Sequence, residues 1–562
     1  MRSQYPLESV FGIRERILPT LLYIMVALAT VSCGKAHASE IPGSACSNDD
    51  NIEEALKSFS SPSTSTRTKV WWFHGEGPST YEGMTADLEA FKQAGIGGVV
   101  YYDQVHGKGD GASDVFSTDW WDKLKYAARE CERLGLSFEI NLSNGYVAGG
   151  PWIDAPHSMQ QLVSGDSIVS GGSTLVLDLN LPTSNAERGT IDIPVKANWY
   201  KDEALIAYPV VDYDPHILKP SRRDSIISWV LSEPQTIRSL TYIARKARKS
   251  RNGAMQIPNG PATTFYGMAY ETPKSVGTLE YSMDGKHFLP IIELPRPGGS
   301  SGTAQRTLSF HPVKAKYFRV TAATDITGAF LSQATTIHKW EEKAVRFSEF
   351  HFDDEEKEDA TEDVAGIIND ETVIDLRPFV DNDGILRWTV PVGTWCVTRI
   401  AAMSTGAKTK HGRAKGMGLE CDKMSAEAVK LHWNHYAAVI IDSLRAAGLS
   451  LDGITMDSHE AGPQNWSADF ETFFEGHCGY SLRPFMPVMV GKIVESKERS
   501  ELFLRDLRRA IADRIATTYF GTLDSLCKAA RVNFTAQASG NGLSLAAAVS
   551  YTHLTLPTTP YV

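Results

Sequence analysis

The densest group of chemically active side chains in the sequence is the ten-residue stretch 457–466, which reads DSHEAGPQNW. It contains two carboxylates, an imidazole, two amides and an indole: Asp457, His459, Glu460, Gln464, Asn465 and Trp466. Hydrolysis of a glycosidic bond needs such a mixture, because one carboxylic acid protonates the leaving oxygen while a carboxylate activates water or attacks carbon. Amides and imidazoles bind sugar hydroxyls, and an indole covers the apolar sugar face and can raise a nearby carboxyl pKa. The stretch therefore predicts a site for sugar chemistry.

Other polar side chains stand at the ends of short apolar runs elsewhere in the chain. In barrels of alternating strands and helices the functional site lies at the carboxyl ends of the strands. We therefore expect these strand-end residues to face one site and to contact substrate. The candidates for substrate binding are His74, Glu76, Asp103, Asn141, Asn144, Asp457, His459, Asn465, Trp466 and Gln537, with Gln104, His106 and Ser143 beside them.

Alternating strands and helices are predicted on both sides of a long central region. Before it, residues 69–73, 97–102 and 136–142 have the pattern of strands, and residues 79–94 and 118–134 that of helices. Strands alternating with helices at this spacing predict βαβ units and a parallel sheet. After the central region, the expected elements are helices at 425–447, 469–475 and 499–532 and strands at 451–456 and 533–538.

The predicted secondary structure of the central region is different. From about residue 166 to 400, short β-like runs recur between Gly, Pro, Ser and Asp residues. The fold class predicted for the whole chain is therefore α/β, an incomplete (β/α)8 TIM-type barrel interrupted by an all-β sandwich insertion. The two barrel parts are expected at 39–165 and 405–548, and the insertion at 166–404.

The N-terminal residues 1–38 have the features of an export signal. A weakly basic segment precedes a run of 14 mostly apolar residues, Leu18 to Val31, which is too short to span a bilayer. Two cleavage sites fit: the A-x-A sequence ending at Ala38, and a lipoprotein-like box that would place a lipid anchor on Cys33. We therefore expect export to the periplasm, outer membrane or exterior, with no transmembrane segment in the mature chain.

Charge and cysteine usage exclude other classes of protein. The net charge of -11 argues against a nucleic-acid partner held through phosphates. The seven cysteines are scattered and form no C-x-x-C pair, so neither a zinc module nor a disulfide-dense scaffold is predicted. One or two disulfides fit an oxidising compartment, but the sequence does not pair them.

The last residues, 549–562, have an unusual composition. The segment VSYTHLTLPT at 549–558 back-translates into a transposase adapter used for sequencing libraries. We therefore expect the natural sequence to end near Ala548 and its gene to continue, with the chain as given inactive and poorly stable because the barrel lacks strands.

Several long stretches resemble glycoside hydrolase family 106, the α-L-rhamnosidases. They are VWWFHGEG (70–77), TADLEAFKQAGIGGV (85–99), NGYVAGGPWI (144–153), SMQ (158–160), GLECDKMS (418–425), DSHEAGPQNW (457–466) and LRRAIADRIATTYFG (507–521). The resemblance implies removal of terminal α-L-rhamnose from an oligo- or polysaccharide with inversion, by two carboxylates and a calcium ion that holds sugar hydroxyls.

The same resemblance implies particular roles. It places the general acid on Glu460, the glutamate of the D-x-x-E segment, and the water-activating glutamate further downstream, beyond the end of this chain. Many relatives carry a glutamate where this sequence has Gln537, between Ala536 and Ala538. That difference bears on rhamnose specificity and on any calcium ligand at this position; the calcium ligands are not assigned.

A second resemblance covers part of the insertion. LEYSMDGKHFLPI (279–291) and FHPVKAKYFRVT (310–321) resemble a discoidin-type β-sandwich, a module that often binds carbohydrate. Two other hypotheses for the whole chain stay open: a non-catalytic carbohydrate-binding protein on a degenerate barrel, and a retaining glycosidase with Glu76 or Asp103 as nucleophile. The distance between the carboxyl groups distinguishes retention from inversion, at about 5–5.5 Å and 6.5–9.5 Å respectively.

Overall fold

The computed structural model describes residues 56–105, 109–145, 147–179, 199–211, 218–245, 275–297, 303–346, 365–457, 459 and 463–537. The chain divides into two compact units, residues 1–63 and residues 64–562. In the first unit residues 56–60 are helical, and all labelled elements from β1 onward belong to the second. The predicted signal, Cys33, His106, Glu460 and the segment 549–562 lie outside the described residues.

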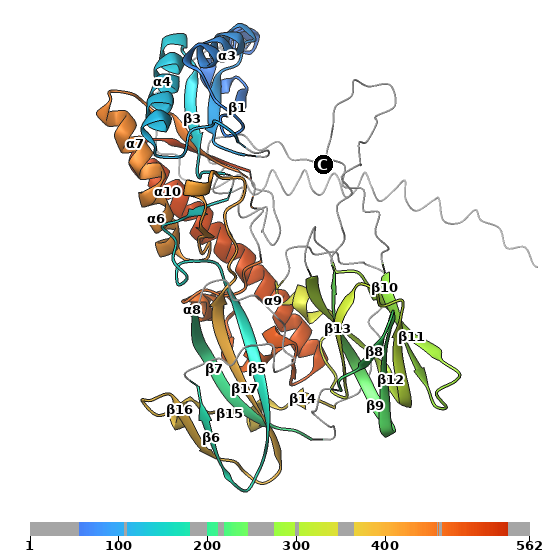
Figure 1. Ribbon diagram of the computed structural model, residues 1–562. Coiled ribbons are helices and arrows are strands. Elements are labelled where there is room, and N and C mark those ends of the chain that lie inside the picture. Colours follow the sequence, from blue (N-terminus) through green and yellow to red (C-terminus); the bar gives the residue numbers. More distant parts are fainter. Residues whose placement is uncertain are drawn as a thin grey trace, which may run out of the picture. The chain divides into compact units, whose positions relative to one another are not determined.

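A five-stranded parallel sheet carries the strand ends singled out above (Figure 1). Its order is β1 (Lys69–Phe73), β2 (Gly98–Tyr102), β3 (Ser137–Asn141), β19 (Gly453–Met456) and β21 (Asn533–Ala536). Every neighbouring pair is parallel, including β3 and β19, which the antiparallel strands separate in sequence. The five carboxyl ends therefore lie along one edge of the sheet.

The pairing register decides which side chains share a face of this sheet. Val100 pairs with Glu139, and Asn141 pairs with Thr455. Because side chains alternate along a strand, Tyr102, Asn141 and Thr455 share one face. The opposite face is apolar and buried, with Val99, Tyr101, Phe138, Ile140, Ile454 and Met456 in the main hydrophobic core. The polar face is thus the one available for chemistry.

The helices around this sheet begin and end at residues suited to those positions. The hydroxyl of Thr80 caps α3 (Tyr81–Gln93) by accepting from Gly83 N, and Ser117 caps α4 (Thr118–Leu134) in the same way. Gly135 ends α4 in the left-handed conformation, φ +62°, which favours glycine. The later helices are α6 (Ala426–His435), α7 (Ala437–Ala446), α8 (Phe470–Cys478), α9 (Lys497–Ile515) and α10 (Gly521–Ala530), with the π-helical turn η7 (Ala516–Phe520) between the last two.

The predicted helix at 425–447 is two helices. Tyr436 breaks it with φ -124° and ψ -76°, outside the helical region. Its side chain is buried, and its ring lies 5.7 Å from that of Phe116. Apolar periodicity continues through the break, and we attribute the break to this long-range packing.

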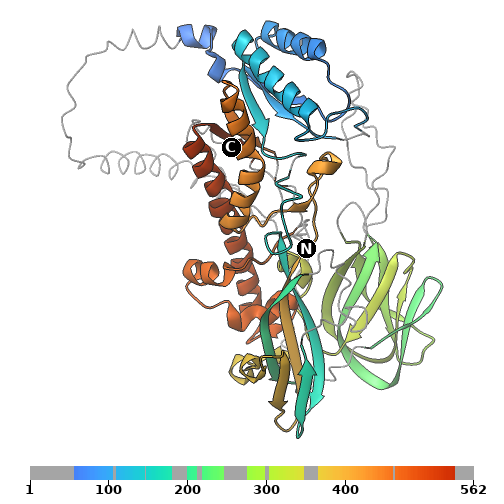
Figure 2. The ribbon, with the colours of Figure 1, turned by 60° about the vertical axis from the view of Figure 1, so that its left-hand side comes forward.

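Antiparallel strands fill the sequence between β3 and β19 (Figure 2). A six-stranded sheet contains β8 to β13, and a four-stranded sheet has the order β15-β7-β17-β5. The antiparallel pairs β16-β6 and β18-β4 complete this region, and a short parallel pair joins β14 to β20, which follows β19 in the sequence. The bounds are β4 (Gly149–Gly150), β5 (Gln160–Ser170), β6 (Thr174–Asp178), β7 (Tyr200–Pro209), β8 (Ser221–Arg223), β9 (Ile226–Arg245), β10 (Ser275–Ser282), β11 (Leu289–Pro295), β12 (Thr303–Thr321), β13 (Ile326–Ser332), β14 (Ile367–Ile368), β15 (Ile374–Asp375), β16 (Ile385–Thr389), β17 (Thr394–Ser404), β18 (Leu419–Glu420) and β20 (Ile493–Val494).

The hydrophobic residues of these strands divide among several cores. The six-stranded sheet has a core of its own, which includes Trp229, Leu240 and Phe318. The strands β5, β7 and β17 instead contribute Leu162, Tyr208 and Ile400 to the core of the parallel sheet. The four-stranded sheet is thus packed continuously with the sheet that carries the strand-end residues.

The described residues also show whether a helix could span a membrane and whether cysteines are paired. No helix among them is long and apolar enough to cross a bilayer. Their five cysteines, Cys131, Cys396, Cys421, Cys478 and Cys527, are free thiols. Cys33 and Cys46 lie outside the described part of the chain.

Candidate active site

Two polar side chains from different strand ends meet over the end of β3. Gln104 follows β2 and Asp457 follows β19, and these strands flank β3 in the sheet. Nε2 of Gln104 donates a hydrogen bond of 2.7 Å to Oδ2 of Asp457, and both side chains are buried. A buried carboxylate held by an amide is fixed in orientation, as a group that positions a substrate must be.

Asp103, beside Gln104, lies in a different environment. Nε1 of Trp120 donates a 2.6 Å hydrogen bond to its Oδ2. Burial raises the pKa of Asp103 to about 7, although the hydrogen bond from Trp120 opposes that increase. Asp103 is therefore partly protonated at neutral pH.

The loop after β3 holds two asparagines against the backbone. Nδ2 of Asn141 donates to the carbonyl of Ser143 over 3.0 Å. Oδ1 of Asn144 accepts from Arg413 N over 2.7 Å. Asn141 lies on the polar face of the sheet, whereas Asn144 joins this loop to the segment that follows β17.

Two histidines at the strand ends are buried and neutral. The His74 ring stacks on Tyr101 with centroids 4.1 Å apart, and its Nδ1 lies 3.0 Å from Ser79 Oγ. Burial, assisted by the charge of Lys123, lowers the pKa of His74 to about 3. Burial and the charges of Lys423 and Lys410 have the same effect on His459. Neither histidine is a general acid at neutral pH, but both remain hydrogen-bonding groups.

The remaining predicted residues differ in exposure. Glu76 is exposed, and Gln537 is half-buried with its backbone N donating to Met456 O over 3.0 Å. Trp466 is 1% exposed and packs edge-on against Phe470, so its ring lies in the core. A stacking role for Trp466 stays a prediction.

Asn465 ties the loop after β19 to other parts of the chain. Its Oδ1 accepts from Leu162 N over 2.9 Å, and its Nδ2 donates to Ala344 O over 2.8 Å. Both ends of the amide are thus bound to backbone, which leaves a sugar-binding role for Asn465 as an untested prediction.

The motif GLECDKMS supplies a buried polar cluster to which we assigned no role from the sequence. Ser467 Oγ and Met424 N donate to the two carboxylate oxygens of Asp422 over 2.7 and 2.8 Å, and Nε2 of Gln464 donates to it as well. Burial raises the pKa of Asp422 to about 6. Asp422 therefore anchors the segment that follows Glu460. The available signal was three charged residues within four positions, Glu420, Asp422 and Lys423.

Lys423 is a buried ammonium beneath the same loops. Its Nζ donates to Glu420 Oε2 over 3.0 Å and to Cys421 O over 3.2 Å, and it lies 5.9 Å from the ring centre of Tyr519. The Tyr519 ring is also a neighbour of His459, at 6.4 Å. The charge of Lys423 contributes, after burial, to the lowered pKa of His459 at the end of β19.

Buried polar atoms without a protein partner gather at this edge of the sheet. Of the 14 such side-chain atoms among the described residues, nine belong to the strand ends or to the loops that cover them. They are His74 Nε2, Tyr102 OH, Asn141 Oδ1, Ser143 Oγ, Asn144 Nδ2, Arg413 Nε, Glu420 Oε1, His459 Nδ1 and Trp466 Nε1. Leaving such an atom unpaired costs about 1–3 kcal/mol, so their concentration marks a site built for a polar ligand.

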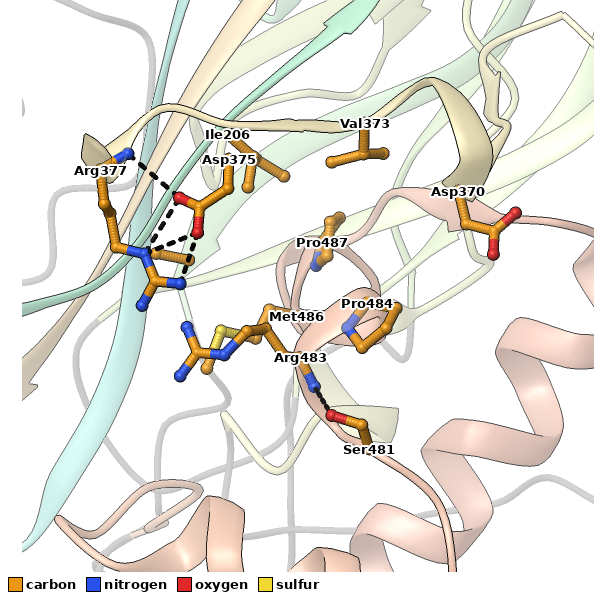
Figure 3. Close-up of a pocket in the computed structure, with 11 residues that line it drawn as sticks. Ile206, Asp370, Val373, Asp375, Arg377, Ser481, Arg483, Pro484, Met486 and Pro487 are labelled. Carbon is orange, nitrogen blue, oxygen red and sulfur yellow. Dashed lines mark hydrogen bonds and ion pairs between the residues drawn. The ribbon is translucent and has the colours of Figure 1, made fainter. Parts of the chain in front are cut away.

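A pocket elsewhere in the structure differs from the strand-end site. A pocket of about 300 Å³ lies between β7, β15 and η6 (Arg483–Val490), and the apolar residues that line it include Ile206 and Met486 (Figure 3). Both of its arginines are paired: Arg377 binds Asp375 over 3.0 Å, and Arg483 binds Glu471. No predicted site residue lines this pocket, so we place the active site at the strand ends.

Comparison with known proteins identifies the family. The sequence model of the alpha-L-rhamnosidase family of glycoside hydrolases, family 106, matches residues 60–552. The chain belongs to glycoside hydrolase family 106. Membership of family 106 confirms the resemblance to this family found in the sequence.

Two individual proteins are similar to this family 106 chain. A rhamnosidase from Novosphingobium sp. PP1Y superposes with a TM-score of 0.71 at 24% identity, over 88% of this chain and 48% of that one. A protein from Formosa agariphila named "Putative beta-glucuronidase" is 25% identical over 512 residues, which are 91% of this chain and 32% of that protein. The chain thus spans about half the length of the first relative and about a third of the second. The structural similarity shows a shared fold.

Proposed function

We propose that this chain forms the site of an inverting glycosidase that removes terminal α-L-rhamnose from an oligo- or polysaccharide. The observation that carries the proposal is the concentration of unpartnered buried polar atoms at the carboxyl ends of β1, β2, β3 and β19. Sugar hydroxyls are both donors and acceptors, so one ring satisfies several of these atoms together. A non-catalytic carbohydrate-binding protein would share this feature, and turnover distinguishes the two.

Glu460 is the proposed general acid, and its neighbours support the assignment. Asp457 precedes it by three residues and is held by Gln104. On the other side, Gln464 and Ser467 are bound to Asp422. Residues with fixed side chains therefore lie on both sides of Glu460 in the sequence, and a general acid must lie within hydrogen-bond reach of the leaving oxygen.

The retaining alternative has less support. A nucleophile must be ionised, but burial holds the pKa of Asp103 at about 7, and its carboxylate already accepts from Trp120. Glu76 is exposed, whereas a nucleophile is expected in a water-excluded site. We therefore keep inversion as the proposal.

Calcium fits the donor atoms at the strand ends only in part. Oδ1 of Asn141 and Oγ of Ser143 are buried oxygens without a protein partner, and calcium accepts neutral oxygen ligands of this kind. The described residues contain no group of three or more His, Cys, Asp or Glu side chains arranged for a metal. We propose that Asn141 and Ser143 contribute to holding calcium, which would orient sugar hydroxyls when bound.

We further propose that the parallel sheet belongs to a (β/α)8-type barrel whose chain is interrupted at 166–404. Its support is the parallel order β1-β2-β3-β19-β21 with helices α3 and α4 between the first three strands. The discoidin-like module corresponds to the six-stranded sheet with its separate core. Export through residues 1–38, with a lipid anchor on Cys33 as one route, stays part of the proposal, as do the barrel parts 39–165 and 405–548.

The experiment that tests the function uses the full-length protein that carries this sequence. It is supplied with 4-nitrophenyl α-L-rhamnoside and, as a comparison, 4-nitrophenyl β-D-glucuronide. Proton NMR during the first turnovers should show β-L-rhamnose as the initial product, because inversion changes the anomeric configuration. Initial α-L-rhamnose would establish retention, and binding without turnover would favour the non-catalytic hypothesis.

A further inference from the structure

The loop that follows β19 pairs with the first residues of β5. Asn465 N donates to Gln160 O over 3.2 Å, and Leu162 N donates to Oδ1 of Asn465 over 2.9 Å. Gln160 and Trp466 also form an isolated antiparallel bridge. The end of the loop is therefore held by a strand of the four-stranded antiparallel sheet.

Gln161, which lies between the two pairing residues of β5, binds two other segments with its side chain. Its Nε2 donates to Pro463 O over 3.0 Å and to Arg346 O over 3.4 Å. The side chain is buried, and a buried amide nitrogen without acceptors would be costly. An amide nitrogen carries two hydrogens, so one group can serve both carbonyls. Gln161 thus joins the loop after β19 to the segment that ends at Arg346.

Residues 344–346 form a strained turn that presents two carbonyls to the same loop. Nδ2 of Asn465 donates to Ala344 O over 2.8 Å, and Gln161 donates to Arg346 O. Val345, between the two carbonyls, has φ +56°, a left-handed conformation that disfavours a β-branched residue. Such a conformation persists where the surrounding structure determines it, and it is often found at functional sites. All three residues of the turn are buried.

Pro463 is the residue through which Gln161 acts on the loop. It stands three residues after Glu460 in the sequence. Because proline has no backbone N–H, its carbonyl is the one backbone group through which a hydrogen bond can hold it, and Gln161 uses that carbonyl. The next residue, Gln464, is bound instead to Asp422. Removal of the Gln161 donor would therefore release the loop at an anchor close in sequence to Glu460.

We propose that Gln161 is a positioning residue of the candidate active site, which holds the loop 457–466 in place through the carbonyl of Pro463. The proposal rests on the proposed function, because this stretch of sequence carries the proposed general acid, Glu460. Both acceptors of the Gln161 amide nitrogen are backbone carbonyls, so Gln161 acts on the reaction through the loop rather than by contact with the sugar.

Gln161→Leu in the full-length protein tests the positioning role. The variant keeps an apolar side chain in the buried space and removes the donor to Pro463 O. We expect kcat/KM on a rhamnosyl disaccharide to fall about tenfold. The loss on 4-nitrophenyl α-L-rhamnoside should be about threefold or less, because an activated aryl leaving group needs little protonation. Loss of folded protein alone would lower both values equally.

Gln333→Leu is the matched control. Gln333 is a half-buried glutamine whose Nε2 donates over 3.2 Å to Oε1 of Gln235, in the six-stranded sheet region. Its replacement should leave the ratio of the two kcat/KM values unchanged. Gln161→Met, which keeps an unbranched side chain, repeats the comparison if Gln161→Leu does not fold. The same ratio in the Gln161 variants as in Gln333→Leu would overturn the proposal.

Hydrogen exchange separates this inference from the proposed function, because it needs no turnover. Mass spectrometry of peptides that cover residues 457–466 should show exchange about tenfold faster in Gln161→Leu than in the parent protein, and unchanged exchange in Gln333→Leu. Faster exchange in a protein that hydrolyses neither substrate would support the hold on the loop while the proposed rhamnosidase activity fails. Unchanged exchange in Gln161→Leu would overturn the inference whatever the activity.

Discussion

The amide of Gln104 donates a 2.7 Å hydrogen bond to the carboxylate of Asp457, although 353 residues separate them in the sequence. The bond joins the ends of β2 and β19 across the end of β3. It orients Asp457, so the position of one carboxylate in the stretch 457–466 depends on a side chain from the first part of the sheet.

Gln104→Leu should therefore impair turnover. Removing the donor leaves the buried Asp457 carboxylate without this partner, at a cost of about 1–3 kcal/mol, and we expect kcat/KM to fall roughly tenfold to a hundredfold. Gln305→Leu is the matched control, because Gln305 is a buried glutamine that donates over 2.8 Å to Glu341 in the antiparallel region. Similar losses of activity in both variants would show that the effect is one of stability alone.

Glu460→Gln should slow hydrolysis in a way that depends on the leaving group. A general acid contributes about 10²–10⁴-fold where the leaving oxygen needs a proton, and much less for an activated aryl group. Steady-state kinetics on a rhamnosyl disaccharide and on 4-nitrophenyl α-L-rhamnoside measure the two cases. Glu475→Gln on the exposed face of α8 serves as the control. Equal modest losses on both substrates would remove Glu460 from this role.

Asp422→Ala should loosen the loop after β19. Gln464, Ser467 and the backbone of Met424 all lose their common acceptor, so we expect the free energy of unfolding to fall by about 2–4 kcal/mol. Asp422→Asn keeps the shape and one acceptor, and it should recover part of this loss. Denaturant titration measures stability, and the leaving-group comparison used for Glu460 measures loop position. Asp442→Ala, at an exposed carboxylate of α7, should change neither.

Asp103 should make stability depend on pH near neutrality. Its folded-state pKa of about 7 lies above the ordinary value of 3.8, so the folded state retains a proton that the unfolded state releases. Stability from this group is present at acidic pH and is lost as the pH rises from about 4 to 7, with a slope of at most about 1.4 kcal/mol per pH unit. Asp103→Asn removes this dependence, so Tm of the variant relative to the parent should rise between about pH 4 and 7. Asp114→Asn should show no such rise, because hydrogen bonds from Lys415 and Arg413 lower the pKa of Asp114.

Calcium removal provides the last prediction. If Asn141 and Ser143 help to hold the ion, chelation should lower Tm as well as activity, because a ligand that binds the folded state alone stabilises it. Calcium should restore both properties, whereas magnesium, which demands tighter octahedral geometry, should restore neither fully. Unchanged Tm and activity after thorough chelation would contradict the calcium proposal.

Local pattern predicted the elements of the parallel sheet closely. Residues 69–73 and 118–134 form β1 and α4 with the expected bounds, because an apolar run and the caps Ser117 and Gly135 act within a few residues. The antiparallel strands were harder to predict. β9 continues through Pro234 and β12 through Pro312, where a register shift between Ser309 and Val313 accommodates the interruption. Proline ends a central strand in most settings, so the sequence predicted shorter pieces.

By itself the sequence determined the family, the residue types of the site and the strand ends on which they stand, because motifs and apolar periodicity are local properties of the chain. Only the tertiary structure decided which of these residues are neighbours. The pairing of β3 with β19 brings Gln104 to Asp457, and the packing of residues 418–424 on the loop after β19 brings Asp422 to Gln464. Such contacts depend on strand order and on the burial of distant segments together, and no local pattern encodes either.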